Sequence, residues 1–353
     1  MRTGKLPPSV LAPLLRRIPR RDPRVVLGSG IGEDAAVIDF LASPFPEGTS
    51  PGGERLLIAK TDPITFATDL IGWYAVHVNA NDVACAGATP RWFLATALLP
   101  ERWQEAQVTA LFDQLVEACS ALGISLVGGH TEVTGGLERP VVVGCMLGEV
   151  ERSRAVQTGG GRPGDALILT QGIALEGTAV LAREAHEQLR ARGVPADTIT
   201  RAQQLLFKPG ISVVGAAQAL CSAVPPPDGV HSLHDPTEGG LASGLWEVAE
   251  ASGTGATVEA EAVQVLPETA AVCRALGLDP FGLLASGALL AAVAPSATAA
   301  AMEALQRQGI PARVIGHLTP REQGITLLGA DGRRREWPQF ERDEVARYFD
   351  SSS

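Results

Sequence analysis

The sequence predicts a two-domain protein of the α/β (α+β) class, and three observations support this. The chain has 353 residues, of which 45% are hydrophobic, which is enough to build more than one core. Short apolar runs typical of strands alternate, in both halves, with longer segments of helical periodicity. Residues 157–165 contain four glycines and a proline, which no regular element tolerates, so we expect a domain junction there.

In the first half, apolar runs bounded by glycine or proline indicate strands, and two longer periodic segments indicate helices. Strands are expected at 35–40, 55–62, 91–99, 125–132 and 141–150. Helices are expected from about residue 70 and over 101–122. In the second helix, apolar residues recur every three or four positions, which predicts a buried stripe that includes Phe112, Val116 and Cys119.

The second half predicts a similar order of elements, without a repeat at the level of residues. Strands are expected at 166–170, 257–263, 288–294, 312–318 and 324–330. Helices are expected at 176–192, 210–222, 241–252, 267–276 and 296–308. The predicted domains are therefore 25–155 and 156–340, between a flexible N-terminal arm (1–24) and a C-terminal tail (341–353).

Composition and charge narrow the possible functions. Acidic residues outnumber basic ones by 39 to 29, which argues against a general binder of nucleic acid and against binding to an anionic membrane surface. Anionic nucleotides are still possible ligands, because a metal ion can supply the positive charge. The five cysteines form no Cys-x-x-Cys pair, and no apolar run is expected to span a membrane, so we expect a cytoplasmic protein.

Polar side chains interrupt the helix-like segment that begins near residue 70. Asn79, Asn81 and Asp82 stand where small apolar residues would pack better, and Asp62 follows an apolar strand. Burying such groups without partners costs about 1–3 kcal/mol each. They therefore bind either one another or a ligand, and this region is the first candidate site.

Four aspartates occupy positions from which side chains can converge. Asp34 ends a glycine-rich loop that begins at Gly28, and Asp62 ends a strand. Asp82 lies near a helix end, and Asp235 precedes another helix. Carboxylates at such positions suit Mg²⁺ bound together with phosphates. An aspartate in a turn is more often a helix cap or a hydrogen-bond acceptor, so spacing alone leaves both interpretations open.

Two other chemistries are weaker. A zinc site could use His231, His234 or His130, but no cysteine lies near them, and hydrogen-bonding or surface histidines are the default. A Ser/His/Asp hydrolase would be expected to carry a Gly-x-Ser-x-Gly elbow, which is absent from the sequence.

Seven short motifs occur in a fixed order between about residues 25 and 330. They are Gly-Ile-Gly-Glu-Asp (30–34), Lys-Thr-Asp (60–62), Asn-Asp-Val-Ala-Cys-Ala-Gly-Ala-Thr-Pro (81–90), Gly-Gly-His-Thr-Glu (128–132), Gly-Gly-Arg-Pro-Gly-Asp (160–165), His-Asp-Pro-Thr-Glu-Gly-Gly-Leu (234–241) and Ala-Ser-Gly-Ala-Leu-Leu (285–290). As an ordered set they resemble the superfamily of aminoimidazole ribonucleotide synthetase. That superfamily also contains the hydrogenase maturation factor HypE, thiamine-monophosphate kinase and selenophosphate synthetase. The motifs at 128–132 and 234–241 look HypE-like.

The resemblance implies a PurM-like fold with two α/β domains. The N-terminal domain would bind ATP and pair with a second copy, so that strands of a homodimer close a β-barrel, and the C-terminal domain would be an α/β sandwich. The implied cofactors are ATP and Mg²⁺. The implied metal ligands are Asp34, Asp62, Asp82 and Asp235. The implied nucleotide-binding residues are Gly32, Lys60, Thr61, Gly128, Gly129, Thr131, Glu132 and Arg154.

Differences from individual branches bear on the reaction. HypE enzymes end in a cysteine that receives a carbamoyl group, whereas the last cysteine of this sequence is Cys273. Selenophosphate synthetase needs a reactive cysteine or selenocysteine in the loop at 28–34, which contains none. Thiamine-monophosphate kinase usually has Gly-Gly-Asp-Thr where this chain has His130, so one metal ligand of that branch is missing.

The resemblance therefore leads us to expect an ATP- and Mg²⁺-dependent enzyme that is HypE-like and hence related to hydrogenase maturation. It would activate an oxygen atom of an unidentified small-molecule or protein substrate by phosphoryl transfer. Two alternatives stay open. One is a small-molecule kinase similar to thiamine-monophosphate kinase, and the other is a catalytically silent scaffold that binds a nucleotide or a partner protein.

Overall fold

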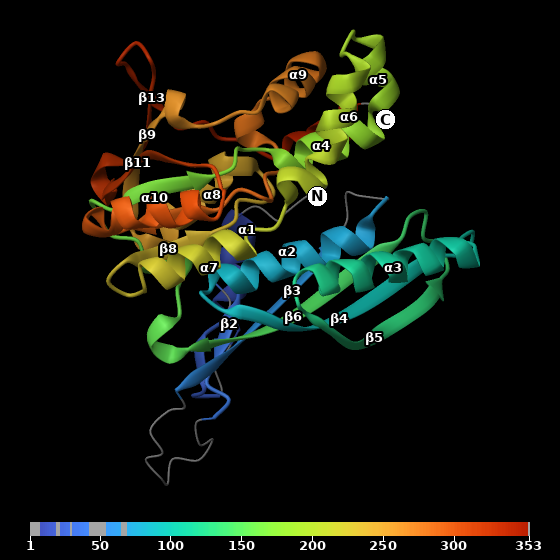
Figure 1. Cartoon of the computed structure of the whole chain (residues 1–353), viewed down its shortest axis with the longest axis horizontal. Helices are drawn as coiled ribbons and strands as arrows, with labels where there is room; N and C mark the ends of the chain where they lie inside the picture. Colours follow the sequence, from blue (N-terminus) through green and yellow to red (C-terminus); the bar gives the residue numbers. More distant parts are fainter. Residues whose placement is uncertain (1–7, 19–21, 29, 42–53, 65–68, 352–353) are drawn as a thin grey trace. The chain divides into compact units, whose positions relative to one another are not determined.

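The computed structural model of the chain describes residues 8–18, 22–28, 30–41, 54–64 and 69–351 (Figure 1). The chain divides into two compact units. The N-terminal unit comprises 20–29 and 34–155, and the C-terminal unit comprises 1–19, 30–33 and 156–353. The change from one unit to the other at residue 156 lies just before the glycine-rich segment 157–165.

The N-terminal unit is built on a six-stranded sheet with the order β1-β2-β3-β6-β4-β5. Its strands are β1 (Val25–Leu27), β2 (Ala36–Ile38), β3 (Arg55–Ile64), β4 (Thr89–Pro100), β5 (Ser125–Thr134) and β6 (Val141–Glu151). Neighbouring strands are antiparallel, except for the parallel pair β4 and β5. The register sets Asp62 on β3 opposite Gly144 on β6.

Two helices, α2 (Ile71–Cys85) and α3 (Glu105–Ala121), pack against this sheet and against each other (Figure 1). In α2 every residue except Trp73 is buried, as expected for a helix between a sheet and a second helix. In α3 the buried residues are Leu111, Leu115, Ala118 and Cys119. The predicted stripe was too wide, because Phe112 and Val116 are 40% and 56% exposed.

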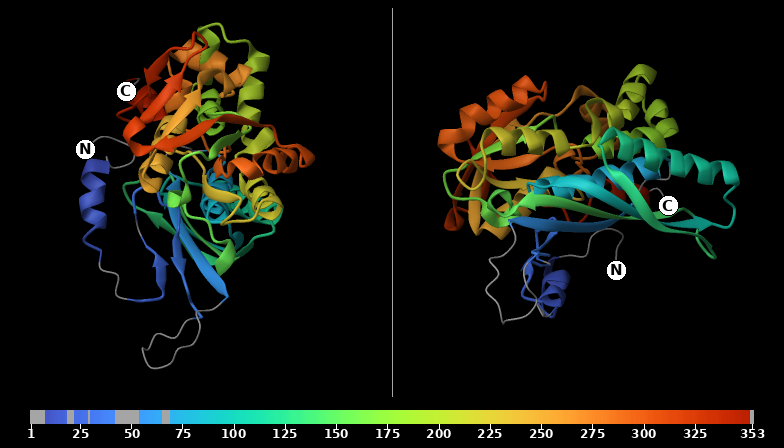
Figure 2. Two further views of the ribbon diagram at one scale, coloured as in Figure 1. Left: turned by 90° about the vertical axis from the view of Figure 1, so that its left-hand side faces the viewer. Right: turned by 60° about the horizontal axis from the view of Figure 1, so that its bottom comes forward.

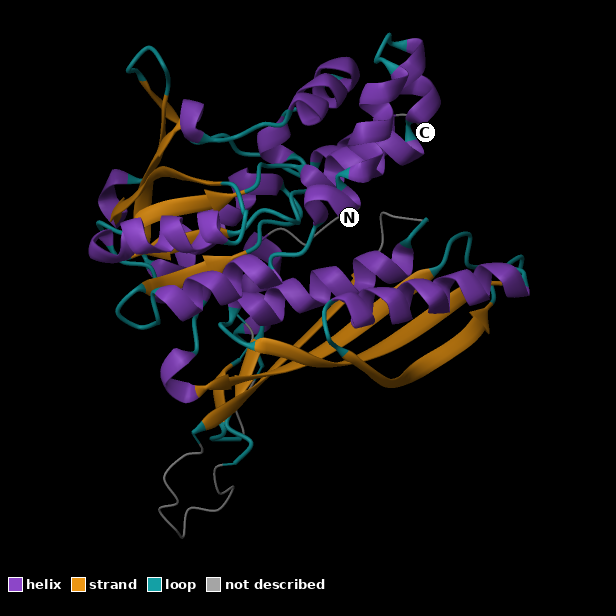
Figure 3. Ribbon diagram, viewed as in Figure 1, coloured by secondary structure: helices purple, strands orange, loops and turns teal. Residues whose placement is uncertain are grey.

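The C-terminal unit contains a seven-stranded sheet with the order β13-β12-β9-β11-β7-β10-β8 (Figure 3). Its strands are β7 (Ala166–Thr170), β8 (Val230–His234), β9 (Thr254–Glu259), β10 (Leu290–Val293), β11 (Ala312–Pro320), β12 (Ile325–Leu328) and β13 (Arg334–Glu336). Only β9 and β12 run parallel. One buried cluster joins Leu245 and Val248 on the helix α8 (Gly240–Ser252) to Leu167, Val258 and Leu290 on the strands.

Further helices belong to the C-terminal unit (Figure 2). They are α1 (Pro8–Leu15), α4 (Leu175–Glu184), α5 (His186–Ala191), α6 (Ala196–Gln204), α7 (Val214–Ala223), α9 (Pro267–Leu276), α10 (Thr298–Arg307) and α11 (Glu344–Ser351), with short 3₁₀ or π turns between some of them. The helices α4, α6 and α9 contact one another, and α7 packs against α10. Both predicted sheets with covering helices are therefore present, as the α/β class requires.

Several elements were not predicted. Helices α1 and α11 fall in the segments expected as arm and tail, α6 falls between two predicted helices, and β8 falls in a predicted loop. Of the predicted arm, residues 1–7 and 19–21 lie outside the described residues. By length and composition the stretch Ala196–Ala223 would pass as a membrane span, contrary to expectation. The structure interrupts it with a non-helical residue, Lys208, and buries half of it.

Candidate carboxylate site on the N-terminal sheet

Strand β3 carries the candidate site because its helix-covered face changes from apolar to polar. Side chains alternate between the two faces of a strand, so Leu56, Ile58, Lys60 and Asp62 share one face. Leu56 and Ile58 are buried there under α2. The same alternation therefore directs Lys60 and Asp62 toward the helix that carries Asn79 and Asp82.

Asn79 is fully buried, and its side-chain amide forms hydrogen bonds with backbone groups. Its Oδ1 accepts a hydrogen bond from the Asp62 amide at 2.9 Å. Its Nδ2 donates to the Ala75 carbonyl at 2.9 Å and to the Asp62 carbonyl at 3.3 Å. The side chain of Asn79 thus fixes the position of Asp62 on the strand, and the desolvation cost of the buried amide is offset.

Gly144 makes this contact possible. It lies opposite Asp62 on β6, and a Cβ atom at this position would lie 2.3 Å from Nδ2 of Asn79 and 2.7 Å from Phe93. Real Cβ atoms do not approach other atoms so closely, so any larger residue here would displace Asn79. Glycine on β6 is therefore a requirement of the site and not of strand geometry.

Lys60, Asp62 and Asp82 form the charged part of the site. The Nζ atom of Lys60 lies 3.2 Å from Oδ2 of Asp62 and 3.3 Å from Oδ1 of Asp82. The Asp82 side chain is 5% exposed, and that of Lys60 is 20% exposed. A buried carboxylate needs a counter-charge, and here one ammonium group serves two carboxylates. The structure thus brings together three residues that the sequence analysis named.

Thr61, a predicted nucleotide-binding residue, is placed differently. By strand alternation it points to the opposite face from Lys60 and Asp62, and its Oγ1 donates to the Gly144 carbonyl at 2.7 Å. In this structure it therefore joins β3 to β6 and does not belong to the charged cluster.

The predicted residues on β5 lie at the exposed edge of the sheet. Gly128, Gly129, Thr131 and Glu132 are all exposed. Gly129 has a φ of 144°, and a Cβ there would lie 1.9 Å from the Ala95 carbonyl oxygen, so β5 can lie this close to β4 only with glycine. The strand therefore presents a row of polar backbone and side chains beside the sheet edge.

His130 and Glu132 form an exposed pair on one face of β5. His130 Nε2 lies 3.0 Å from a Glu132 carboxylate oxygen, and the Thr134 hydroxyl donates to the other oxygen at 3.1 Å. The hydrogen bonds from His130 and Thr134 lower the pKa of Glu132. Glu132 is therefore an ionised group with fixed orientation, which is what a ligand-contacting carboxylate at a strand edge requires.

The other predicted residues are spread over both units. Asp34 precedes β2 and Arg154 ends a 3₁₀ turn (Arg152–Arg154), both in the N-terminal unit. Gly32 belongs to the C-terminal unit and has a φ of 80°. A Cβ atom at this position would lie 2.9 Å from the Glu247 carbonyl oxygen, so a larger residue would clash there. Asp235 follows β8 in the same unit and is 1% exposed. Their convergence with Asp62 and Asp82 stays a prediction.

Near Asp235, the structure places two buried carboxyl groups that the sequence analysis missed. Asp343 accepts hydrogen bonds from the backbone amides of Gly239 and Val345, both at 2.7 Å, and so ties the C-terminal segment to the start of α8. Burial raises the pKa of Asp343 to about 7. Burial also raises the pKa of Glu176 to about 7, with a smaller contribution from neighbouring carboxylates that include Asp235. The sequence marks Asp343 only as a residue that precedes the helix α11, where Val345 is its local partner. Gly239, and the carboxylates that influence Glu176, are distant in the sequence.

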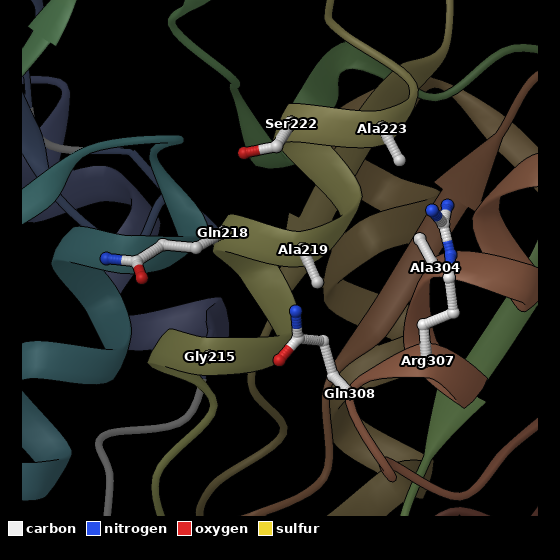
Figure 4. A pocket seen from close by; sticks show the side chains of 8 residues that line it. All are labelled: Gly215, Gln218, Ala219, Ser222, Ala223, Ala304, Arg307 and Gln308. Carbon is white, nitrogen blue, oxygen red and sulfur yellow. The ribbon is translucent and has the colours of Figure 1, made fainter.

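A groove of about 480 Å³ lies elsewhere in the C-terminal unit, between α7 and α10 (Figure 4). Its walls include Gly215, Gln218, Ala219 and Arg307. It contains no carboxylate, cysteine or histidine, and none of the predicted site residues lines it. The groove therefore does not compete with the carboxylate site as a place for chemistry.

His77 gives the N-terminal unit a predictable response to acid. It is buried on α2, stacks on Trp73 at 4.3 Å and donates from Nδ1 to the Trp73 carbonyl at 2.9 Å. Burial lowers the pKa of His77 from 6.5 to about 4. The unfolded chain therefore binds the proton more tightly, so the free energy of unfolding is fully retained above pH 6.5 and falls as the pH drops toward 4.

We expect a loss of about 2 kcal/mol from His77 between pH 7 and pH 5, measured by urea unfolding. His77→Met should remove this part of the pH dependence, whereas His317→Met, at an exposed histidine, should leave it unchanged. An unchanged pH profile in His77→Met would contradict the assignment.

The fold and the site together define a class of protein. It is a two-unit α/β protein whose N-terminal sheet carries an acidic site bridged by a lysine. The chain belongs to the family of AIR synthase related proteins. A model of the family's N-terminal domain matches residues 32–150, and a model of its C-terminal domain matches residues 162–328.

Two relatives agree with this family, and a solved structure agrees with the fold. Carbamoyl dehydratase HypE of Cupriavidus necator is 32% identical over 280 residues, covering 76% of this chain and 74% of that protein. Carbamoyl dehydratase HypE of Rhizobium leguminosarum bv. viciae is 29% identical over 301 residues, covering 81% of each chain. A crystal structure of hydrogenase maturation protein HypE in complex with ATP superposes with a TM-score of 0.70, at 24% identity, over 98% of both chains. The expected PurM-like two-domain fold is thereby confirmed.

Proposed function

We propose that this protein is an ATP- and Mg²⁺-dependent enzyme that activates an oxygen atom of its substrate by phosphoryl transfer. The observation that carries the proposal is the pair of carboxylates, Asp62 and Asp82, held around a single positive charge in a family whose member HypE has been crystallised with ATP. The substrate is unidentified, and the relatives named carbamoyl dehydratase support a HypE-like reaction class.

The donor atoms fit magnesium. All side-chain donors in the pair are carboxylate oxygens, the ligand type that Mg²⁺ prefers, and a cationic group already lies between them. Asp62 and Asp82, joined by Asp34 and Asp235, would hold the metal. When bound, Mg²⁺ would neutralise the charge that develops on the transferred phosphoryl group.

The chain's own residues would then position the nucleotide. The exposed glycines of β5, Gly128 and Gly129, leave the backbone accessible for phosphate oxygens, with Thr131 and Glu132 beside them. Gly32 and Arg154 are further proposed contacts. Asn79 acts on the site through the backbone of Asp62, so it is a positioning residue.

The direct test is magnesium-dependent consumption of ATP by the purified chain, followed with γ-labelled ATP. Thiamine monophosphate as acceptor separates the kinase alternative from a HypE-like reaction, since only the kinase would label it. Tight Mg–ATP binding with no turnover for any acceptor tried would favour the scaffold over the enzyme.

We also propose that two copies pair through the N-terminal sheet. The sheet face away from α2 carries apolar side chains that are only half-buried, among them Leu94, Val143 and Leu147. Among the described residues, β5 pairs with β4 alone, and its Val133 is 64% exposed. An apolar sheet face beside an open edge is suited to closing against a second copy.

Light scattering at micromolar concentration should therefore give twice the chain mass of 36.8 kDa. Val143→Lys should shift the protein to the monomer, because it buries a charge in the proposed interface. Val116→Lys, at an exposed valine on the helix α3 and therefore off the sheet, is the matched control and should stay dimeric. A wild-type monomer would contradict this proposal.

A further inference from the structure

The ammonium group of Lys60 occupies the position that a metal ion would need between Asp62 and Asp82. Its Nζ atom lies 3.2 Å and 3.3 Å from one oxygen of each carboxylate. The lysine reaches this position because it stands two residues before Asp62, on the same face of β3. The position of Lys60 between the two carboxylates therefore follows from the geometry of the strand.

The charges explain why the bridge forms. Two carboxylates close together repel each other, and the Asp82 side chain is almost fully buried. The two carboxylates together carry a charge of −2, and the ammonium group of Lys60 reduces the net negative charge of the cluster to −1. A metal ion that takes these same two oxygens displaces the ammonium, because two cations on the same carboxylate oxygens repel each other strongly.

The lysine side chain is suited to such an exchange. It is a compact point charge on a flexible four-carbon stem, and it can swing between partners without the fixed two-point geometry of arginine. The Lys60 side chain is also 20% exposed, so it is not locked in the core. The triphosphate of a nucleotide offers a displaced ammonium new anionic partners.

We propose that Lys60 is an internal counter-ion that exchanges with the metal–nucleotide complex. Without nucleotide, its ammonium neutralises Asp62 and Asp82. When Mg–ATP arrives, the metal takes the carboxylates and the ammonium moves onto phosphate oxygens. Metal and nucleotide then bind as a coupled pair, and metal alone binds weakly. This inference rests on the proposed function and adds a rule for how the site fills.

The test is calorimetric titration of Mg²⁺, and separately Mn²⁺, into nucleotide-free protein. In the absence of nucleotide, Lys60→Met should bind the metal ion at least about tenfold more tightly than wild type, because no ammonium group competes for the carboxylates. The same variant should bind Mg–ATP more weakly than wild type, because the phosphates lose a cation. The coupling between metal and nucleotide should therefore shrink.

Three variants separate this role from a structural one. Arg55→Met removes one positive charge from the same strand at an exposed pair with Glu149, and it should change neither affinity. Lys60→Arg keeps the charge and should keep metal-only binding weak. Lys60→Gln removes the charge but keeps a polar side chain, which serves if Lys60→Met does not fold. In either neutral variant, Mg²⁺ without nucleotide should raise the melting temperature more than in wild type.

The outcomes are distinguishable. If the neutral variants bind metal alone no more tightly than wild type while wild type binds Mg–ATP, the counter-ion exchange is wrong and the proposed function stands. If neither wild type nor variant binds metal or ATP, the proposed function fails and the exchange fails with it.

Discussion

Asp82→Asn is expected to lower magnesium-dependent ATP consumption about 100-fold or more, with little change in the fold. Asparagine keeps the shape of the side chain and removes its charge. Asp82 is 4% exposed and comes from α2, the helix that also anchors β3 through Asn79. Because the buried helix α2 fixes the backbone of Asp82, the loss should appear in turnover and in metal binding together.

The measurement is phosphate release at saturating ATP over a range of Mg²⁺ concentrations. Asp113→Asn, at an exposed aspartate on α3, is a matched control with the same change in charge and unit, and it should keep wild-type activity. Added Mg²⁺ that restores the Asp82→Asn rate would indicate weakened metal binding alone. Wild-type activity in Asp82→Asn at all Mg²⁺ concentrations would remove this residue from the site.

Gly144→Ala is expected to destabilise the N-terminal unit by about 2–4 kcal/mol and to weaken Mg–ATP binding at the same time. The new methyl group would lie 2.3 Å from Nδ2 of Asn79, so the amide must move. Its hydrogen bonds to Asp62 and Ala75 would then be lost or lengthened, and buried polar groups would be left unsatisfied. The added methyl group should therefore lower both the free energy of unfolding and the affinity for Mg–ATP.

Urea unfolding and ATP calorimetry on the same preparation test the effect of this substitution. Gly135→Ala is the control, because a Cβ there meets no atom within 4 Å. It should change stability by less than about 1 kcal/mol. Equal stability of Gly144→Ala and wild type would mean that Asn79 does not hold β3 in the manner described.

The core of the site could be predicted from the sequence, because the free-energy cost of burying polar groups is enough to predict that they have partners. Asn79 and Asp82 on an otherwise small and apolar helix required partners. The structure supplies both kinds of answer: Asn79 binds the backbone of Asp62, and Asp82 binds Lys60. The position of Lys60 could also have been inferred, since it shares the alternation of Asp62 on β3.

Other features depend on contacts between distant parts of the chain and leave no local pattern. Strand β8 has the sequence Val-His-Ser-Leu-His, which is too polar to suggest a buried strand. Its His231 lies 2.8 Å from Asp165, and its Ser232 donates to the Thr158 carbonyl at 2.7 Å. These partners make the strand possible, but they stand 66 and 74 residues away. Asp343, 104 residues from Gly239, is a similar case.

Exposed apolar residues account for another difference. Periodicity on α3 predicted that Phe112 and Val116 face the core, and the structure leaves them exposed. Periodicity records which residues share a helix face, but it does not state whether that face is covered by the same chain or by a second one. A stripe predicted from one sequence therefore includes residues at the margin of the buried helix face, and these residues stay exposed in the folded chain.

The most direct test of the central claim is a calorimetric titration of ATP into the wild-type protein, with and without Mg²⁺. We expect micromolar binding with Mg²⁺ and much weaker binding when the metal is chelated, because Asp62 and Asp82 repel triphosphate unless a dication binds them. Binding that does not depend on Mg²⁺, or no binding at millimolar ATP, would contradict the assignment of these carboxylates to a metal–nucleotide site.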